Sequence, residues 1–104
     1  GVAGFTRLPA EKIWYARGTI QFWYGDLDAA LDNMRRVTAR AQDLDLNTGT
    51  FAWLRLGQIC DLKGRRSEAV QAYRHAVRLA PESDAAKQCR RFLSAPYRRD
   101  RQKG

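Results

Sequence analysis

Three side chains in this sequence have chemistry that proteins readily tune near neutral pH: the lone histidine His75 and the cysteines Cys60 and Cys89. The two cysteines follow no metal-binding or redox spacing, and a single histidine does not complete a zinc site with them. His75 stands between Tyr73 and Ala76, which face the core of an expected helix, so its ring is expected at the surface. We predict two buried free thiols, no metal site and no catalytic histidine.

Motifs for catalysis or cofactor binding are also missing. The sequence contains no G-x-S-x-G elbow, no glycine-rich phosphate loop and no H-E-x-x-H pair. We therefore predict no catalytic residue and no cofactor in these 104 residues, although a longer parent protein could carry an enzyme elsewhere. The functional surface is then expected to be one that binds another molecule.

The positive charge is concentrated in the second half of the chain. Residues 1–50 hold six basic and six acidic side chains, whereas residues 51–104 hold thirteen and five, which accounts for the whole net charge of +8. Such an asymmetry suits an acidic partner, and a solvated basic face is the alternative. The arginines that could form a polyanion face are Arg65, Arg66, Arg90, Arg91, Arg98 and Arg99.

Length and composition indicate one globular domain. The chain has 104 residues, of which 44% are apolar and 29% charged, and its apolar runs are too short for a transmembrane helix. No signal peptide opens the sequence. Because residue 1 is glycine rather than methionine, we expect a fragment or a processed chain, which leaves the localisation open.

Two apolar stripes at helical spacing lie between residues 50 and 83. Trp53, Leu56, Ile59 and Cys60 recur at i, i+3, i+6 and i+7, which predicts one amphipathic helix. The stripe of a second helix consists of Ala69, Ala72, Tyr73, Ala76, Val77 and Ala80. The two stripes predict a pair of helices that pack against each other.

Fixed offsets within this segment indicate a repeat family. The motif residues are Trp53, Leu56 and Gly57 as W-x2-L-G, Ala69 and Tyr73 as A-x3-aromatic, and Pro81 at the end. The segment resembles the tetratricopeptide repeat (TPR), a helix–turn–helix of 34 residues, which is also the length of 50–83. Cys60 stands where the family prefers tyrosine, and both side chains fit an apolar position. Gly57 has no side chain and is expected to let the two helices approach closely.

A degenerate unit of the same kind is predicted at about residues 11–44. Trp14 and Gly18 repeat the tryptophan-to-glycine offset, and Ala30 and Met34 repeat the offset from alanine to a large residue. The departures from the family pattern are Arg17 in place of leucine, Gln21 in place of tyrosine, and the lack of a closing proline. The resemblance implies an all-α fold: a short α-solenoid of two TPR-like helical hairpins and a C-terminal capping helix.

The helix boundaries follow from capping and breaking residues. The predicted helices span 10–24, 27–41, 50–63, 66–80 and 83–94. A loop around 43–49 is expected to hold the extra residues between the two units, because Asn47 and Gly49 are turn formers. Asp26 and Ser83 are expected to cap the second and fifth helices with their side chains.

The two ends of the chain are expected to lie outside the helical domain, which spans 9–95. Residues 1–8 predict an extended arm with apolar anchors at Phe5 and Leu8. Residues 96–104 form a basic tail that is expected to fray beyond the last helix.

The binding surface is implied by the family resemblance. In TPR proteins the first helix of each repeat lines a concave groove that binds peptides or partner segments. The residues that the resemblance places there are Lys12, Tyr15, Thr19, Phe22, Trp23, Phe51, Leu54, Gln58, Asp61 and Leu62. Some chaperone-binding members grip a carboxylate with lysine and asparagine at positions held here by Tyr15, Thr19, Leu54 and Gln58, so that clamp is absent. The alternative is that part of this strip belongs to the core or is covered by the N-terminal arm.

These observations predict a non-catalytic protein–protein interaction module that binds a protein or peptide segment, with self-association as a further option. One alternative is a basic surface for nucleic acid or another polyanion, which is disfavoured because Tyr97 is the only aromatic residue in the tail. Another alternative is a structural cap of a larger repeat protein. Polyanion binding would weaken steeply with salt, whereas apolar binding would not.

Overall fold

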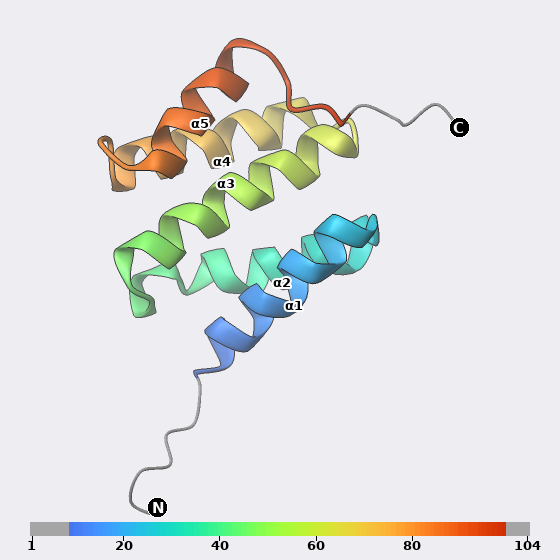
Figure 1. Ribbon diagram of the computed structural model, residues 1–104, viewed down its shortest axis with the longest axis vertical. Coiled ribbons are helices and arrows are strands. Elements are labelled where there is room, and N and C mark those ends of the chain that lie inside the picture. The colour runs from blue at the N-terminus through green and yellow to red at the C-terminus, as the bar shows by residue number, and fades with distance from the viewer. Residues whose placement is uncertain (1–8, 100–104) are drawn as a thin grey trace, which may run out of the picture.

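The computed structural model describes residues 9–99 and is all-helical over that range (Figure 1). Its elements are α1 (Ala10–Tyr24), α2 (Leu27–Ala39), a short 3-10 helix (Ala41–Asp43), α3 (Leu46–Leu62), α4 (Arg66–Leu79) and α5 (Asp84–Ser94). The predicted all-α class is confirmed. The predicted arm at 1–8 lies outside the described residues. None of the helices described is both long and apolar enough to cross a membrane.

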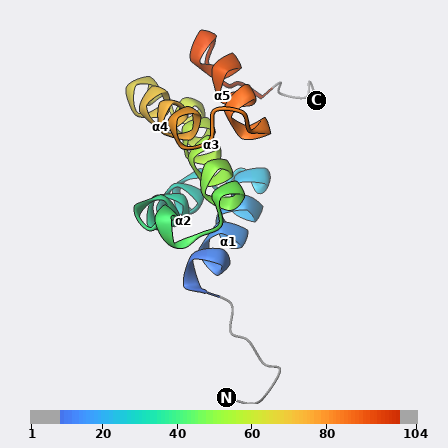
Figure 2. The same cartoon turned by 90° about the vertical axis from the view of Figure 1, so that its left-hand side faces the viewer.

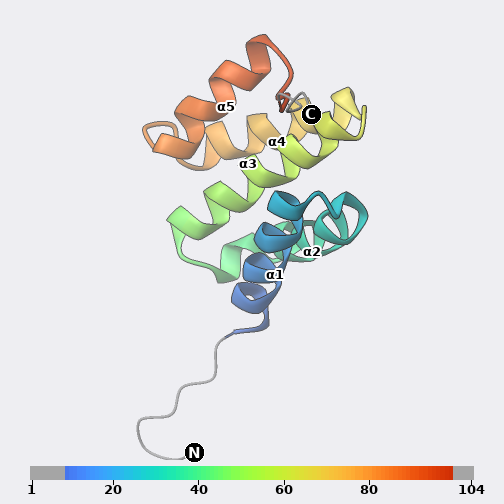
Figure 3. The ribbon, with the colours of Figure 1, turned by 45° about the vertical axis from the view of Figure 1, so that its right-hand side comes forward.

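Each helix packs against the next one along the chain. α1 and α2 form one hairpin, α3 and α4 form the next, and α5 lies across the second hairpin on the side away from the first (Figure 3). α3 also contacts both α1 and α5, and it lies in the middle of the molecule, with α1 and α5 on one side and α2 and α4 on the other (Figure 2). The first helices of the two hairpins, α1 and α3, are therefore in contact with each other.

A glycine on the first helix of each hairpin sets how closely the second helix approaches. A Cβ atom added at Gly57 would lie 2.3 Å from Cε1 of Tyr73, which shows that the ring occupies the space of a missing side chain. A Cβ at Gly18 would lie 2.9 Å from Cε of Met34. In both hairpins the glycine and its partner are 16 residues apart in the sequence. The first hairpin thus repeats the central contact of the second.

The start of α3 differs from the prediction. A loop was expected over 43–49, but α3 begins at Leu46, and Gly49 lies inside the helix. The Asp45 side chain caps this helix by accepting hydrogen bonds from the Thr48 N–H at 3.0 Å and the Thr48 hydroxyl at 2.9 Å. Gly49 is buried in this helix, and a Cβ at this position would lie 3.4 Å from the Ala41 carbonyl oxygen, an ordinary contact distance.

The two predicted caps, at Asp26 and Ser83, have opposite outcomes. Ser83 caps α5 as predicted, because its hydroxyl accepts a hydrogen bond from the Ala86 N–H at 3.0 Å. The cap predicted at Asp26 is wrong, since its side chain makes no capping hydrogen bond. Asp26 has ψ of 75°, whereas the capping residues Asp45 and Ser83 are extended, with ψ of 152° and 160°. Only the extended conformation aims the side chain at the first free N–H groups of the helix.

The Asp45 cap predicts a specific pH dependence. The two hydrogen bonds from Thr48 lower the pKa of Asp45 from 3.8 to about 2. A lowered pKa stabilises the fold fully above pH 3.8, and this stabilisation is lost as the pH falls through 2. Asp45→Ala should lower the melting temperature at neutral pH, whereas Asp45→Asn should keep much of it, because asparagine also caps helices. Thermal unfolding followed by circular dichroism, near neutral pH and near pH 2, tests this. A melting temperature of the Asp45→Ala variant that equals that of the wild type at neutral pH would contradict the cap.

Candidate functional site

The ten residues predicted to line a groove on α1 and α3 divide into two groups in the structure. Those that keep exposed side-chain surface are Lys12, Tyr15, Thr19, Trp23, Phe51 and Leu62. The side chains that are buried are Phe22, Leu54, Gln58 and Asp61. Phe22 and Leu54 have no exposed surface at all and belong to the core. The alternative that part of this strip is core therefore holds for these two residues.

Asp61 fixes the C-terminal end of the fold rather than facing solvent. Its carboxylate accepts hydrogen bonds from the Tyr73 hydroxyl at 2.7 Å and from Arg66 Nη1 at 3.0 Å. It also accepts one from the backbone N–H of Tyr97 at 2.9 Å. Burial raises the pKa of the Tyr73 hydroxyl, which stays protonated and keeps donating. One carboxylate thus joins α3, α4 and the segment after α5.

The segment that follows α5 packs against the helices as far as the structure describes it, to residue 99. The Tyr97 ring lies 5.1 Å from the Phe92 ring and 6.0 Å from the Phe22 ring, measured between centroids. Arg99 donates from Nη2 to the Phe22 carbonyl oxygen at 2.5 Å. The expected fraying of the tail therefore does not extend to residues 96–99, because Asp61 and Phe22 provide partners for them.

Arginine and aromatic side chains gather where this segment meets α1 and α3. The guanidinium carbons of Arg55 and Arg99 lie 4.9 Å and 4.1 Å from the centre of the Phe22 ring. They also lie 5.4 Å and 5.3 Å from the centre of the Trp23 ring. Trp23 packs edge-on against Phe22 and is 57% exposed. We call Phe22, Trp23, Arg55 and Arg99 the arginine–aromatic cluster.

Comparison with known families identifies the second hairpin. Residues 50–83 match the family model of the tetratricopeptide repeat, over the segment in which Gly57 packs against Tyr73. Residues 50–83 form a TPR. The comparisons with curated proteins and with solved structures found no match. TPRs generally mediate protein–protein interaction and are typically non-catalytic.

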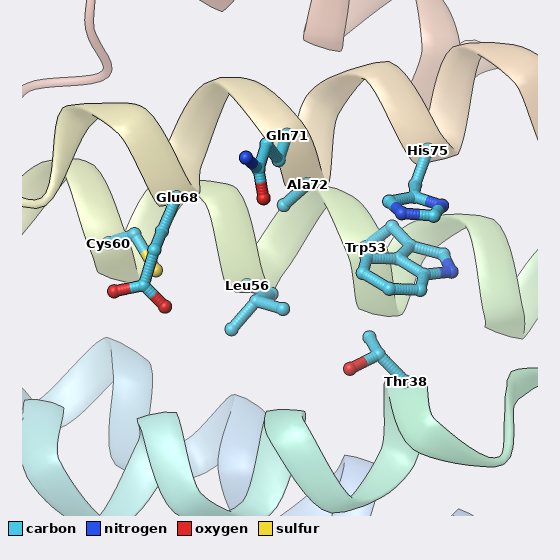
Figure 4. Close-up of a pocket in the computed structure, with 8 residues that line it drawn as sticks. All are labelled: Thr38, Trp53, Leu56, Cys60, Glu68, Gln71, Ala72 and His75. Atoms are coloured by element: carbon cyan, nitrogen blue, oxygen red, sulfur yellow. The ribbon is translucent and has the colours of Figure 1, made fainter.

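A shallow cavity of about 260 Å³ lies between the TPR and α2 (Figure 4). His75 is exposed, as predicted, and its ring stacks on Trp53 with 4.2 Å between centroids and 11° between planes. Burial lowers the pKa of His75, and the nearby charge of Arg78 lowers it further. His75 and Cys60 lie at opposite ends of the cavity (Figure 4). They do not form a nucleophile–base pair.

The two cysteines are buried free thiols, as predicted. Burial raises the pKa of Cys60 to about 11 and that of Cys89 to about 12, so both stay protonated near neutral pH. Within residues 9–99, no three His, Cys, Asp or Glu side chains gather in a way that could hold a metal ion.

The arginines of the predicted polyanion face are mostly engaged with neighbours in and around the TPR. Arg65 pairs with Glu68, and Arg66 pairs with Asp61. The other contacts are Arg90 with the Pro81 carbonyl oxygen, Arg91 with the Phe92 ring and Arg99 with Phe22. Arg98 is exposed. These contacts spread the six guanidinium groups over several elements instead of aligning them.

Proposed function

We propose that this chain binds a segment of a partner protein on the side formed by α1, α3 and residues 95–99. The observation that carries the proposal is the exposed indole of Trp23 within the arginine–aromatic cluster. Tryptophan, tyrosine and arginine are the residue types that contribute most to binding energy in protein interfaces. The half-buried side chains of this surface are already held by their neighbours, so ordering them on binding costs less conformational entropy.

The neighbouring residues extend this surface along both helices. Tyr15 and Thr19 precede Trp23 on α1, and Phe51 and Leu62 flank Arg55 on α3, all with part of their surface exposed. The large apolar side chains that are exposed in residues 9–99 are Ile13, Ile20, Trp23, Tyr24, Leu46 and Leu79. Four of these six lie on α1. Concentration of exposed apolar surface on one helix supports a binding role for that helix, because scattered exposure needs no such explanation.

Substitution of Trp23 tests this proposal. A phage-displayed library of random peptides would be selected on the wild-type protein, and the peptides recovered would be synthesised. Trp23→Ala should weaken their binding by about thirtyfold, the loss typical of an interface hot spot. Calorimetric titration would measure the affinities, and circular dichroism would show that the variant is folded.

Leu46→Ala provides a matched control for the Trp23 variant. Leu46 is also 57% exposed, but it is the first residue of α3 and lies outside the arginine–aromatic cluster. This variant should bind the same peptides as tightly as the wild type. Failure to recover any peptide, or equal binding by the Trp23→Ala variant, would overturn the proposed function.

A further inference from the structure

Three buried polar atoms at the proposed binding surface have no hydrogen-bond partner in the part of the chain that the structure describes. They are the Thr19 hydroxyl and the Nε atoms of Arg55 and Arg99. No other side-chain N or O atom in residues 9–99 is both buried and unpaired in this way. Buried polar groups in folded proteins are nearly always satisfied, so three such atoms on neighbouring residues need a cause.

The charges around these atoms also lack compensation. Among residues 9–99, neither Arg55 nor Arg99 forms an ion pair with a carboxylate. The buried carboxylate of Asp61, on the same helix as Arg55, already accepts hydrogen bonds from Arg66, Tyr73 and Tyr97. Burial lowers the pKa of Arg55, and the neighbouring Tyr15 and Tyr97 offset part of this effect. Arg55 Nη1 donates to Gln58 Oε1 and Arg99 Nη2 donates to the Phe22 carbonyl oxygen, both neutral acceptors. The two guanidinium groups thus share the Phe22 and Trp23 rings without a carboxylate partner among residues 9–99.

We propose that Arg55 and Arg99 bind a carboxylate of an acidic partner peptide. The Nε atoms are buried, but both arginines keep part of their surface exposed, so a ligand on the surface would be held by the Nη donors that are not already bonded to Gln58 or Phe22. The Phe22 and Trp23 rings hold the planar guanidinium groups in place, and their forked donors match a carboxylate. The residue flanking the carboxylate would contact the exposed indole of Trp23.

The site requires the segment after α5. Arg99 reaches α1 because the Tyr97 N–H is bonded to Asp61 and because Arg99 itself donates to the Phe22 carbonyl oxygen. Neither guanidinium stands at a position of the lysine and asparagine clamp of chaperone-binding TPR domains. A peptide rather than an isolated phosphate is favoured because aromatic surface surrounds the guanidinium groups, and this inference therefore rests on the proposed function.

Methionine substitutions test the role of the two arginines. Arg55→Met and Arg99→Met keep an unbranched stem over the Phe22 ring but remove the donors. Peptides that carry a glutamate should lose about tenfold in affinity for each variant, as expected for a charge-assisted hydrogen bond. Versions of the same peptides with glutamine should bind weakly and equally to wild type and variants. Arg91→Met is the matched control, since Arg91 lies 5.3 Å from the centre of the Phe92 ring on α5 and carries the same charge.

A measurement without any peptide separates this inference from the proposed function. In the wild-type protein, the arginine Nε–H signals in a nitrogen–proton correlation spectrum would be followed during a titration with sodium acetate at constant ionic strength. The Arg55 and Arg99 signals should move, and the Arg91 signal should not. Movement of all three signals alike, or of none, would overturn the carboxylate site, as would a response to inorganic phosphate alone. Selected peptides that depend on Trp23 but not on a carboxylate would leave the proposed function intact and refute this inference.

Discussion

Replacing Gly57 with alanine is expected to destabilise the protein by about 1–3 kcal/mol, the usual cost of overpacking a core. In an exposed helix the same change would stabilise the fold by about 0.5–1 kcal/mol, because alanine favours helix formation. The expected change in the free energy of unfolding therefore has the opposite sign to the change that helix propensity alone would give. The reason is the distance of 2.3 Å between the added Cβ and Cε1 of Tyr73, which is too short for two non-bonded carbon atoms.

The Tyr73 ring has little freedom to move away. Its hydroxyl donates to Asp61 at 2.7 Å, and its ring packs against Phe92 with 5.7 Å between centroids. Tyr73 has no exposed surface. A shift of the ring would break the hydrogen bond to Asp61 or displace α5, so the clash would be relieved by separating α3 from α4. Gly57→Leu would force that separation further.

Gly18→Ala is the matched control in the first hairpin. Its Cβ would meet the Cε atom of Met34 at 2.9 Å, which is the end of a flexible side chain. The added Cβ would also lie 3.2 Å from the Asn33 Cβ, so some loss is expected. Both distances exceed the 2.3 Å at Gly57, and this variant should therefore lose less stability than Gly57→Ala. Urea unfolding gives both free energies, and a loss for Gly18→Ala that equals or exceeds the loss for Gly57→Ala would refute this account of helix packing.

The helix pairs were predictable from the sequence because packing leaves a local signature. The helices of a hairpin pack closely where a small residue, Gly57, faces a large one, Tyr73. The same spacing of 16 residues between a glycine and a large residue recurs at Gly18 and Met34. The starts of α1, α2 and α4 were also predicted correctly, whereas the start of α3 was not. The same residue type, aspartate, caps α3 at Asp45 but not α2 at Asp26, because the outcome depends on backbone ψ.

The binding surface was predictable only in part, because helical spacing does not say how deep each position lies. Phe22 and Trp23 are adjacent in sequence, yet one is fully buried and the other is 57% exposed. Arg55 was not among the predicted site residues, since it lies between apolar positions of α3 and no motif includes it. Arg99 was predicted as part of a basic tail and of a possible polyanion face, but not of the groove. A contact between residues 22 and 99 spans most of the chain and leaves no pattern in the sequence.

Asp61→Asn is expected to produce the second large loss of stability, about 2–4 kcal/mol. Removing one partner of a fully buried ion pair typically costs about 3–5 kcal/mol, and the value is reduced here because the Arg66 side chain is 36% exposed. Asparagine can accept fewer hydrogen bonds than a carboxylate, and its amide would meet the donors of Arg66, Tyr73 and Tyr97.

Asp28→Asn supplies the control for the Asp61 variant. Asp28 pairs with Lys63 between α2 and the end of α3, but its side chain is 89% exposed, so loss of this pair should change stability very little. Urea unfolding near neutral pH measures both variants. Equal stabilities of the Asp61→Asn and Asp28→Asn variants would show that the buried carboxylate does not anchor the fold.

The Asp61 variant also links stability to binding. Without the Asp61 carboxylate, the Tyr97 N–H loses its acceptor, and the chain that carries Arg99 to Phe22 loses its attachment to α3. Binding of a glutamate-containing peptide should then weaken about as much as in the Arg99→Met variant, even under conditions where circular dichroism shows the helices intact. Combining Asp61→Asn with Arg99→Met should add little further loss, because the two changes act on the same contact. Fully additive losses would mean that Asp61 does not position Arg99.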